Sequence, residues 1–178
     1  GKKLIDKVNN HLLSSNNKRL NIAFLGRLSL ENEVAKFTQS IELLRKKGFT
    51  VSMKWVGDGP LRSLAETVGE VTGFVNEPTQ YLQTADIIFV SSYLSLLEAQ
   101  SLGKICCSFY SHALKKRYLE TYPGSQWCVV AEEPQQLLEQ LLKLTDSEAL
   151  TLRTAGKDWA TLQTWEKVTD TYEAIWNS

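Results

Sequence analysis

Residues 20–26 read LNIAFLG, a short apolar run that is closed by a glycine. A run of this form is typical of a strand that is buried on both faces of a parallel sheet. Residues 30–47 follow with apolar side chains at helical spacing, and Gly48 stands where a helix would end. Residues 49–56 then predict a second strand. The sequence thus opens with a strand, a helix and a strand, the unit from which parallel sheets are built.

The same alternation of apolar runs and helical segments continues along the chain. Because the connections are short, we predict an α/β fold: a doubly wound, Rossmann-like parallel sheet of about six strands, with helices on both faces and C-terminal helices appended. The pattern is helical from residue 134 onward, with breaks expected near Ser147 and Gly156. The predicted strands are residues 20–26, 49–56, 71–75, 85–90, 104–109 and 127–130, and the predicted helices between them are 30–47, 61–68, 78–84, 93–102 and 112–120.

The chain is predicted to have two parts. Residues 19–178 form a single Rossmann-like domain, and residues 1–18 form a helix that precedes it. Leu4, Ile5, Val8 and Leu12 would share one face of this N-terminal helix. The spacing fits an interdomain helix and a simple packing helix equally well.

Composition excludes several classes of protein. The 178 residues carry 20 basic and 20 acidic side chains, so no general attraction to nucleic acid or to anionic lipid is expected. No apolar run reaches the roughly 18–20 residues that span a bilayer, and the N-terminus does not read as a signal peptide. The three cysteines, Cys106, Cys107 and Cys128, are an odd number and lie in apolar runs, which favours buried thiols in a reducing compartment. We therefore expect a cytoplasmic protein.

Two glycine-bearing loops follow the first two predicted strands. Ligands of such sheets bind at the carboxyl ends of the strands, so these loops are candidate binding loops. Gly26 allows a sharp turn, and Arg27 places a cation suited to phosphate there, although a surface arginine would look the same. Gly57, Asp58 and Gly59 leave space for a ligand or for a neighbouring loop, and ordinary turn chemistry also explains them.

A third candidate follows the apolar run ADIIFV at residues 85–90. Residues 91–99, SSYLSLLEA, predict the start of a helix, whose free N–H groups and dipole can hold a phosphate. Glu98 lies about one turn into this segment and could accept hydrogen bonds from sugar hydroxyls. Ser95 and Glu98 also match a capping box, and spacing alone favours this structural role.

Other motifs of catalysis are missing from the sequence. It contains no Walker A motif, no G-x-G-x-x-G fingerprint and no G-x-S-x-G elbow. His11 and His112 are far apart, and no spacing of Cys and His suggests zinc. We expect no metal and no cofactor.

The order of the pieces is more informative than any single one. The series IAFLGRL, WVGDGP, VTGFV, ADIIFVSS and SLLEAQSLGK, followed by Trp165-Glu166, spans residues 20–176. It resembles the nucleotide-sugar-binding C-terminal domain of the GT-B-fold, retaining group 1 (family 4) glycosyltransferases. The most specific parts are GDGP and LLEAQSLGK.

The resemblance implies a role for each matching position. Arg27 would contact the donor diphosphate, and Glu98 the ribose hydroxyls. The loop at residues 57–59 would flank the nucleotide pocket, and the backbone at residues 73–75 would meet the base. The backbone near Ser95 and Leu96 would lie beside the phosphates. Arg27 and Glu98 are thus the implied catalytic residues, and the implied donor-binding residues are Gly26, Gly57, Asp58, Gly59, Phe74, Val75, Ser92, Ser95 and Leu96.

Three features depart from the family pattern. The lysine expected a few residues after Arg27 is missing, and Val90 stands where the first glutamate of the E-x7-E motif is expected. The segment between Ser92 and Leu96 is also shorter than in the family. Removing one donor that stabilises a developing charge raises a barrier by about 2.7–4 kcal/mol, so these losses bear directly on catalysis. Lys36, Lys104 and Lys115 are candidate substitutes.

The resemblance also implies a substrate and a partner. The domain would bind a UDP- or GDP-linked sugar, and an N-terminal acceptor-binding domain, absent from this chain, would complete the enzyme and provide any peripheral membrane association. This chain alone would then be inactive, because the cleft that orients the acceptor is incomplete. Two other interpretations stay open: a catalytically degenerate GT-B-like scaffold domain, and, less favoured, an unrelated flavodoxin-like nucleotide or regulatory domain.

Overall fold

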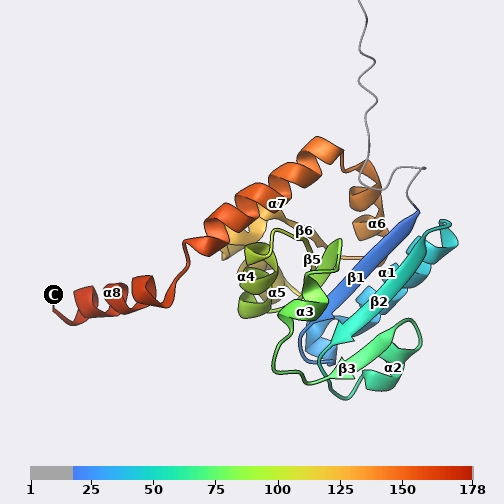
Figure 1. Cartoon of the computed structure of the whole chain (residues 1–178), viewed down its shortest axis with the longest axis horizontal. Coiled ribbons are helices and arrows are strands. Elements are labelled where there is room, and N and C mark those ends of the chain that lie inside the picture. Colours follow the sequence, from blue (N-terminus) through green and yellow to red (C-terminus); the bar gives the residue numbers. More distant parts are fainter. Residues whose placement is uncertain (1–17, 178) are drawn as a thin grey trace, which may run out of the picture.

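The computed structural model describes residues 18–177, so the helix predicted over residues 1–18 lies almost wholly outside the described residues. The described chain forms one sheet of six strands in the order β3-β2-β1-β4-β5-β6, with every neighbouring pair parallel (Figure 1). The predicted doubly wound sheet is therefore confirmed. The strands are β1 (Arg19–Leu25), β2 (Thr50–Val56), β3 (Glu70–Gly73), β4 (Ile87–Val90), β5 (Ile105–Phe109) and β6 (Cys128–Ala131).

Helices cover both faces of the sheet (Figure 1). One apolar cluster joins the sheet to α1 and α6, and a second joins its other face to α3, α4 and α5. The helices are α1 (Val34–Lys46), α2 (Arg62–Glu66), α3 (Thr79–Leu82), α4 (Tyr93–Ser101), α5 (Ala113–Thr121), α6 (Pro134–Lys143), α7 (Asp146–Thr161) and α8 (Trp165–Trp176), with short 3-10 turns η1 (Leu30–Asn32) and η2 (Pro123–Trp127).

Aromatic side chains fill the core between α1 and the sheet. Phe37 of α1 stacks on Phe89 of β4, with ring centroids 4.5 Å apart. Phe24 of β1 packs against Trp55 of β2, with ring centroids 5.1 Å apart. All four residues are fully buried, so the strands adopt their places because one shared apolar layer removes these large rings from water.

The first helix begins later than its apolar spacing predicts. The 3-10 turn η1 comes first, and Glu33 then adopts the left-handed conformation with φ of 59° before α1 starts at Val34. A residue with positive φ cannot continue a right-handed helix, so the predicted helix over residues 30–47 is divided at this point.

The C-terminal helices also divide differently. The break expected near Ser147 is found at residues 144–145, but the one expected at Gly156 is wrong, because α7 runs through this glycine. Gly156 is buried against Trp127, whose Cβ would lie 3.2 Å from a Cβ added to the glycine. Glycine thus permits close packing of α7 here rather than ending it.

The last helix, α8, projects beyond the end of α7 and away from the sheet (Figure 1). Its large apolar side chains are exposed, including Trp165 and Trp176. Within residues 18–177, no helix is both long and apolar enough to cross a membrane.

Candidate functional site

The carboxyl ends of the parallel strands meet at one edge of the sheet. The strand order reverses between the paired strands β1 and β4, because the chain after β1 continues to α1 on one face of the sheet and the chain after β4 to α4 on the other. In open α/β sheets, ligands bind in the crevice outside the carboxyl ends at such a reversal. The loops after β1, β2, β3 and β4 all reach this edge, and they contain most of the predicted site residues. Ser95, Leu96 and Glu98 lie instead within α4 (Tyr93–Ser101).

Four of the predicted residues surround one small hollow at this edge. Its volume is about 160 Å³. Ligand pockets usually measure about 300–1,000 Å³, so this hollow could hold only one part of a nucleotide-sugar. The aromatic ring of Phe74 is 81% exposed at its rim. The predicted residues Gly26, Gly57, Phe74 and Val75 line the hollow together with Leu25, Val56 and Pro78, which the sequence did not single out.

Backbone hydrogen bonds join the glycine-bearing loop after β1 to the one after β2. The Gly26 N–H donates to Val56 O (3.1 Å), and the Leu28 N–H donates to Asp58 O (2.9 Å). A Cβ on Gly57 would lie 1.9 Å from the carbonyl oxygen of Gly26, and one on Gly59 would lie 2.4 Å from that of Leu28. The sequence left open whether these glycines make room for a ligand or for a neighbouring loop, or only form a turn. In the structure, Gly57 and Gly59 make room for the neighbouring loop.

Asp58 has partners within its own loop and in α2. One carboxylate oxygen accepts a hydrogen bond from the Gly59 N–H (2.8 Å), and the other pairs with Arg62 Nη1 (2.9 Å). These contacts hold the turn against the start of α2. Asp58 does not line the hollow, so its observed contacts are those of a loop-forming residue.

Arg27 lies exposed in the loop after β1. Its carbonyl oxygen accepts a hydrogen bond from Asn32 Nδ2 (2.8 Å), which anchors its backbone. The pKa of the nearby Glu31 carboxyl is lowered, chiefly by hydrogen bonds to its own backbone and to Ser29, and to a smaller degree by the Arg27 charge. Among residues 18–177, no carboxylate lies within ion-pair distance of the guanidinium, which is therefore available to an anion.

The start of α4 differs from the predicted capping box. Ser92 is the N-cap: its Oγ accepts from the Ser95 N–H (3.4 Å), and Ser95 Oγ accepts from the Ser92 N–H (3.2 Å). The box formed by Ser95 and Glu98 is therefore wrong, because the helix begins at Tyr93. The Leu96 N–H also bonds within the helix, to Ser92 O (3.0 Å). By helix geometry, the N–H groups left for a ligand are those of Tyr93 and of residue 94.

Glu98 does not have the capping role that its spacing favoured, because Ser92 and Ser95 form the capping box of α4. Its carboxylate is partly buried in α4, and burial raises its pKa. No side chain of the described residues forms a hydrogen bond or ion pair with this carboxylate. A desolvated carboxylate of this kind is suited to accept hydrogen bonds from a ligand's hydroxyl groups.

The three candidate substitutes for the missing lysine lie in different places. Lys36 Nζ donates to Glu132 O (2.5 Å) and to Tyr110 O (3.3 Å), so it ties α1 to the loops after β5 and β6. Lys104 Nζ donates to Ala85 O (2.8 Å) at the amino-terminal edge of the sheet, opposite the crevice. Lys115 of α5 donates to Ser91, the residue that directly follows β4. Lys115 alone of the three thus lies at the reversal point.

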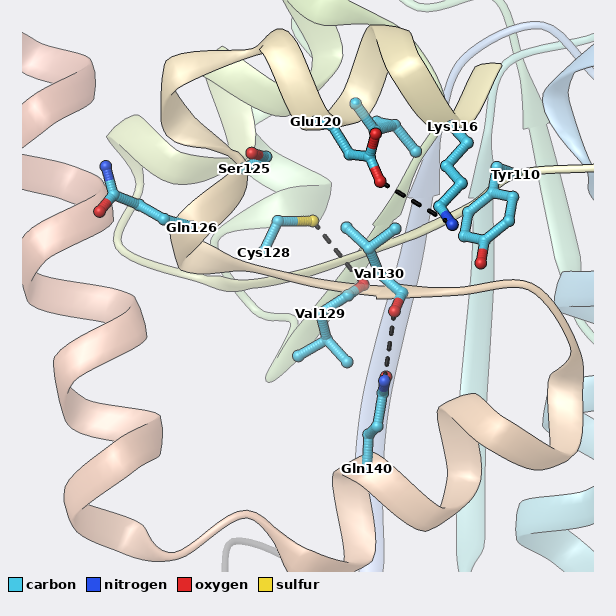
Figure 2. A pocket seen from close by; sticks show the side chains of 10 residues that line it. Tyr110, Lys116, Glu120, Ser125, Gln126, Cys128, Val129, Val130 and Gln140 are labelled. Atoms are coloured by element: carbon cyan, nitrogen blue, oxygen red, sulfur yellow. Dashed lines mark hydrogen bonds and ion pairs between the residues drawn. The ribbon is translucent and has the colours of Figure 1, made fainter. Parts of the chain in front are cut away.

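Figure 2 shows another hollow, of about 490 Å³, along the outer edge of β6 between α5 and α6. Gln140 Nε2 donates to Val130 O (3.3 Å) and so occupies part of the strand's outer edge. Lys116 Nζ lies 3.9 Å from Glu120 Oε1, so the cation at this hollow has an acidic partner. The described residues also contain no cluster of three His, Cys, Asp or Glu side chains that could hold a metal. No predicted site residue lines this hollow.

Comparison with known protein families identifies the chain. Residues 19–147 match the family described as "Glycosyl transferases group 1", which is more than half of the sequence. The chain belongs to the group 1 glycosyl transferases. The resemblance read from the ordered motifs is therefore confirmed at the level of the family. None of the curated proteins matches this group 1 chain by sequence.

Solved structures of glycosyltransferases share the fold of this group 1 domain. A TarM G117R mutant from S. aureus, solved with fondaparinux, α-GlcNAc-glycerol and UDP, is 14% identical with a TM-score of 0.71, covering 91% of this chain and 36% of its own. The pneumococcal O-GlcNAc transferase GtfA, solved with UDP and GlcNAc, is 15% identical with a TM-score of 0.62, covering 94% and 37%. The C-terminal domain of LpcC from Francisella tularensis is 16% identical with a TM-score of 0.60, covering 81% and 85%.

The covered share of each solved chain shows how much of a glycosyltransferase this group 1 chain spans. The chain spans under two fifths of the length of TarM and GtfA but most of the isolated LpcC domain. At 14–16% identity the likeness concerns the fold. The described residues thus have the architecture of one GT-B glycosyltransferase domain.

Proposed function

We propose that this chain binds the nucleoside diphosphate of a UDP- or GDP-sugar and acts as the donor-binding half of a retaining glycosyltransferase. The observation that carries the proposal is the shared hollow at the carboxyl edge, which brings together Gly26, Gly57, Phe74 and Val75. These residues come from loops up to 49 positions apart in the sequence, and the family resemblance implies a donor-binding role for all four.

Each part of the donor has a group in the proposed site that is suited to bind it. The hollow beside Phe74 is suited to a flat nucleobase, because an exposed aromatic ring offers a stacking face. Glu98 has a partly desolvated carboxylate, without a side-chain partner among residues 18–177, for the ribose hydroxyls. Arg27 provides a guanidinium that no carboxylate of the described residues pairs with, and it would stabilise the negative charge that develops on the leaving diphosphate.

A further part of the enzyme would be required for transfer. TarM and GtfA are more than twice as long as this chain, which supports the proposal that an acceptor-binding domain faces the crevice in the complete protein. Transfer requires both substrates to be oriented and water to be excluded, and one open domain does neither. We therefore expect the isolated chain to bind a nucleotide without transferring sugar.

A second candidate function is that of a degenerate scaffold domain. It is favoured by the short connection between β4 and α4, which consists of residues 91–92 only. Ser95 and Leu96 use their N–H groups within α4, so this connection offers a phosphate few donors. A scaffold of this kind would use exposed apolar side chains such as Trp165 and Trp176 of α8.

Titration of the chain with UDP and GDP in a calorimeter tests the proposal. We expect a Kd in the micromolar to millimolar range for one of them. Arg27→Ala and Glu98→Ala should each weaken binding about tenfold, the size of one hydrogen bond to a charged group. Arg153→Ala is the matched control, because Arg153 Nε donates to Gly103 O (3.0 Å) at the opposite edge of the sheet. Absence of binding at millimolar nucleotide would contradict the proposal and favour the scaffold.

A further inference from the structure

A lysine from α5 lies at the carboxyl end of β4, where the strand order reverses. Lys115 Nζ donates to the carbonyl oxygen of Ser91 and to its Oγ (2.9 Å). Ser91 is the first residue after β4, and its side chain is buried, with 4% exposure. The ammonium group is thus held at the point of the sheet where ligands of this architecture bind.

The Lys115 ammonium lies over the ring of Tyr118, 5.8 Å from its centroid, but it has no paired carboxylate among the described residues. An ammonium group has three N–H donors, and the contacts to Ser91 use two of them, both toward neutral oxygens. Among residues 18–177, no carboxylate lies within ion-pair distance of Nζ. Burial lowers the pKa of Lys115, and the more distant charge of Glu33 partly opposes this effect. A partly buried cation without a paired anion is unfavourable until an anionic ligand supplies one.

Glu33 stands on the β1 side of the same point. It is buried, with 6% exposure, and its left-handed φ of 59° ends the turn η1. The loop after β1 therefore brings a carboxylate rather than a second cation toward the crevice, in addition to Arg27. Positive charge on the β4 side must come from another element, and Lys115 is placed to provide it.

We propose that Lys115 contacts the diphosphate of the nucleotide donor, so that α5 adds a second cation for the leaving group beside Arg27, in place of the lysine that the loop after β1 lacks. The inference rests on the proposed function, since it assumes that a nucleoside diphosphate occupies the crevice. Two N–H groups keep the ammonium on Ser91, and the third is left for a phosphate oxygen. Held in this way, the charge needs little reorganisation when negative charge builds up on the leaving group.

A purely structural role makes a different prediction. If Lys115 only ties α5 to the end of β4, its loss should reduce stability and affect all ligands alike. A contact with the diphosphate should instead affect charged ligands selectively. Affinity for UDP must therefore be compared with affinity for uridine, which has the same base and sugar without the phosphates.

The experiment measures both ligands on the full chain and on three variants, by calorimetry and by NMR titration. Lys115→Met should weaken UDP binding about ten- to hundredfold and change uridine binding less than twofold. Lys115→Arg, which keeps the charge, should retain more UDP affinity than Lys115→Met. Lys116→Met is the matched control and should change neither affinity, since Lys116 points to the hollow beside β6 and pairs with Glu120 (Figure 2). If GDP binds more tightly than UDP, GDP and guanosine replace the uridine pair.

A second readout avoids any effect of substitution on folding. In the unchanged protein, the Lys115 Cε–Hε signal, assigned from the Lys115→Arg spectrum, should shift with UDP and not with uridine. Equal UDP affinity in Lys115→Met, or a signal that UDP leaves unmoved, would overturn the inference while the proposed function stands. If the unchanged chain binds neither UDP nor GDP, the proposed function fails first and the inference falls with it.

Discussion

The α-carbon of Gly57 faces the carbonyl oxygen of Gly26 so closely that a Cβ at residue 57 would lie 1.9 Å from that oxygen. The two residues are 31 positions apart and belong to different loops, after β1 and β2. Their contact continues the pairing of the two strands beyond the sheet, through the hydrogen bond from the Gly26 N–H to Val56 O (3.1 Å). The hollow that Gly26 and Gly57 line therefore depends on a glycine at residue 57, whether or not that residue contacts a ligand.

Gly57→Ala should destabilise the fold by about 2–4 kcal/mol, because neither backbone can move without breaking the strand pairing. Thermal unfolding followed by circular dichroism measures this change. Gly48→Ala is the control: its φ of 90° is also unfavourable for alanine, but the nearest atom to its added Cβ is the Lys18 Nζ, at 3.7 Å. The control should cost about 1 kcal/mol, and equal losses in the two variants would show that the close approach to Gly26 has no energetic effect.

Glu98→Gln should raise stability at neutral pH and lower affinity for the nucleotide. Burial raises the folded-state pKa of Glu98, so at pH above that value the folded chain must keep a partly desolvated charge. The unfolded chain has no such penalty, and below its ordinary pKa near 4.5 both states are protonated. The gain from glutamine should therefore be complete at neutral pH and disappear as pH falls below about 4.

Denaturant unfolding of both proteins between pH 3 and pH 8 measures this difference, at about unit intervals of pH. Glu42→Gln is a suitable control, since Glu42 is exposed on α1. A gain that is equal at every pH, or equal in both variants, would argue that burial of the Glu98 carboxylate is not its cause.

Ser92→Ala should destabilise the chain by about 1 kcal/mol, the usual effect of losing an N-cap side chain. The Ser92 hydroxyl accepts from the Ser95 N–H and also lies 2.8 Å from Ser95 Oγ. Chemical denaturation gives the change in free energy, with Ser63→Ala, at an exposed position of α2, for comparison. If the Ser63 variant lost as much stability as the Ser92 variant, the cap would not account for the effect.

Lys104→Met should reduce stability and leave nucleotide binding unchanged. Lys104 Nζ donates to Gln83 O (2.6 Å) and Ala85 O (2.8 Å), both at the amino-terminal edge of the sheet. The melting temperature reports the first effect and calorimetric titration with UDP and GDP the second. A loss of affinity without a loss of stability would place Lys104 at the ligand and contradict the assignment of the crevice to the carboxyl edge.

Local sequence patterns predicted much of this architecture. The run at residues 20–26 and the later apolar runs identified the six strands, because short apolar segments of this kind are typical of a buried parallel sheet. Only β4 and β5 are buried along their whole length, while β1, β2, β3 and β6 also carry exposed or partly exposed residues. The order of the motifs indicated the family, and the resemblance implied that Gly26, Gly57, Phe74 and Val75 belong to one site; the structure brings these four residues together around the same hollow.

Other features depended on contacts that local patterns do not encode. The spacing of Ser95 and Glu98 matched a capping box, but packing of α4 behind β4 begins the helix at Tyr93 and makes Ser92 the cap. The break expected at Gly156 is missing because this glycine lies against Trp127, 29 positions earlier in the sequence.

What the sequence alone determined is the sheet, its crevice and the family, since these follow from short-range periodicity and from the order of the loops. The tertiary structure decided which of three lysines reaches the crevice, because only folding brings Lys115 to Ser91 across 24 positions. It also decided that Gly57 makes room for a neighbouring loop and that, within residues 18–177, no side chain pairs with the Glu98 carboxylate. Side-chain roles of this kind arise from contacts between distant residues, for which one-dimensional spacing carries no signal.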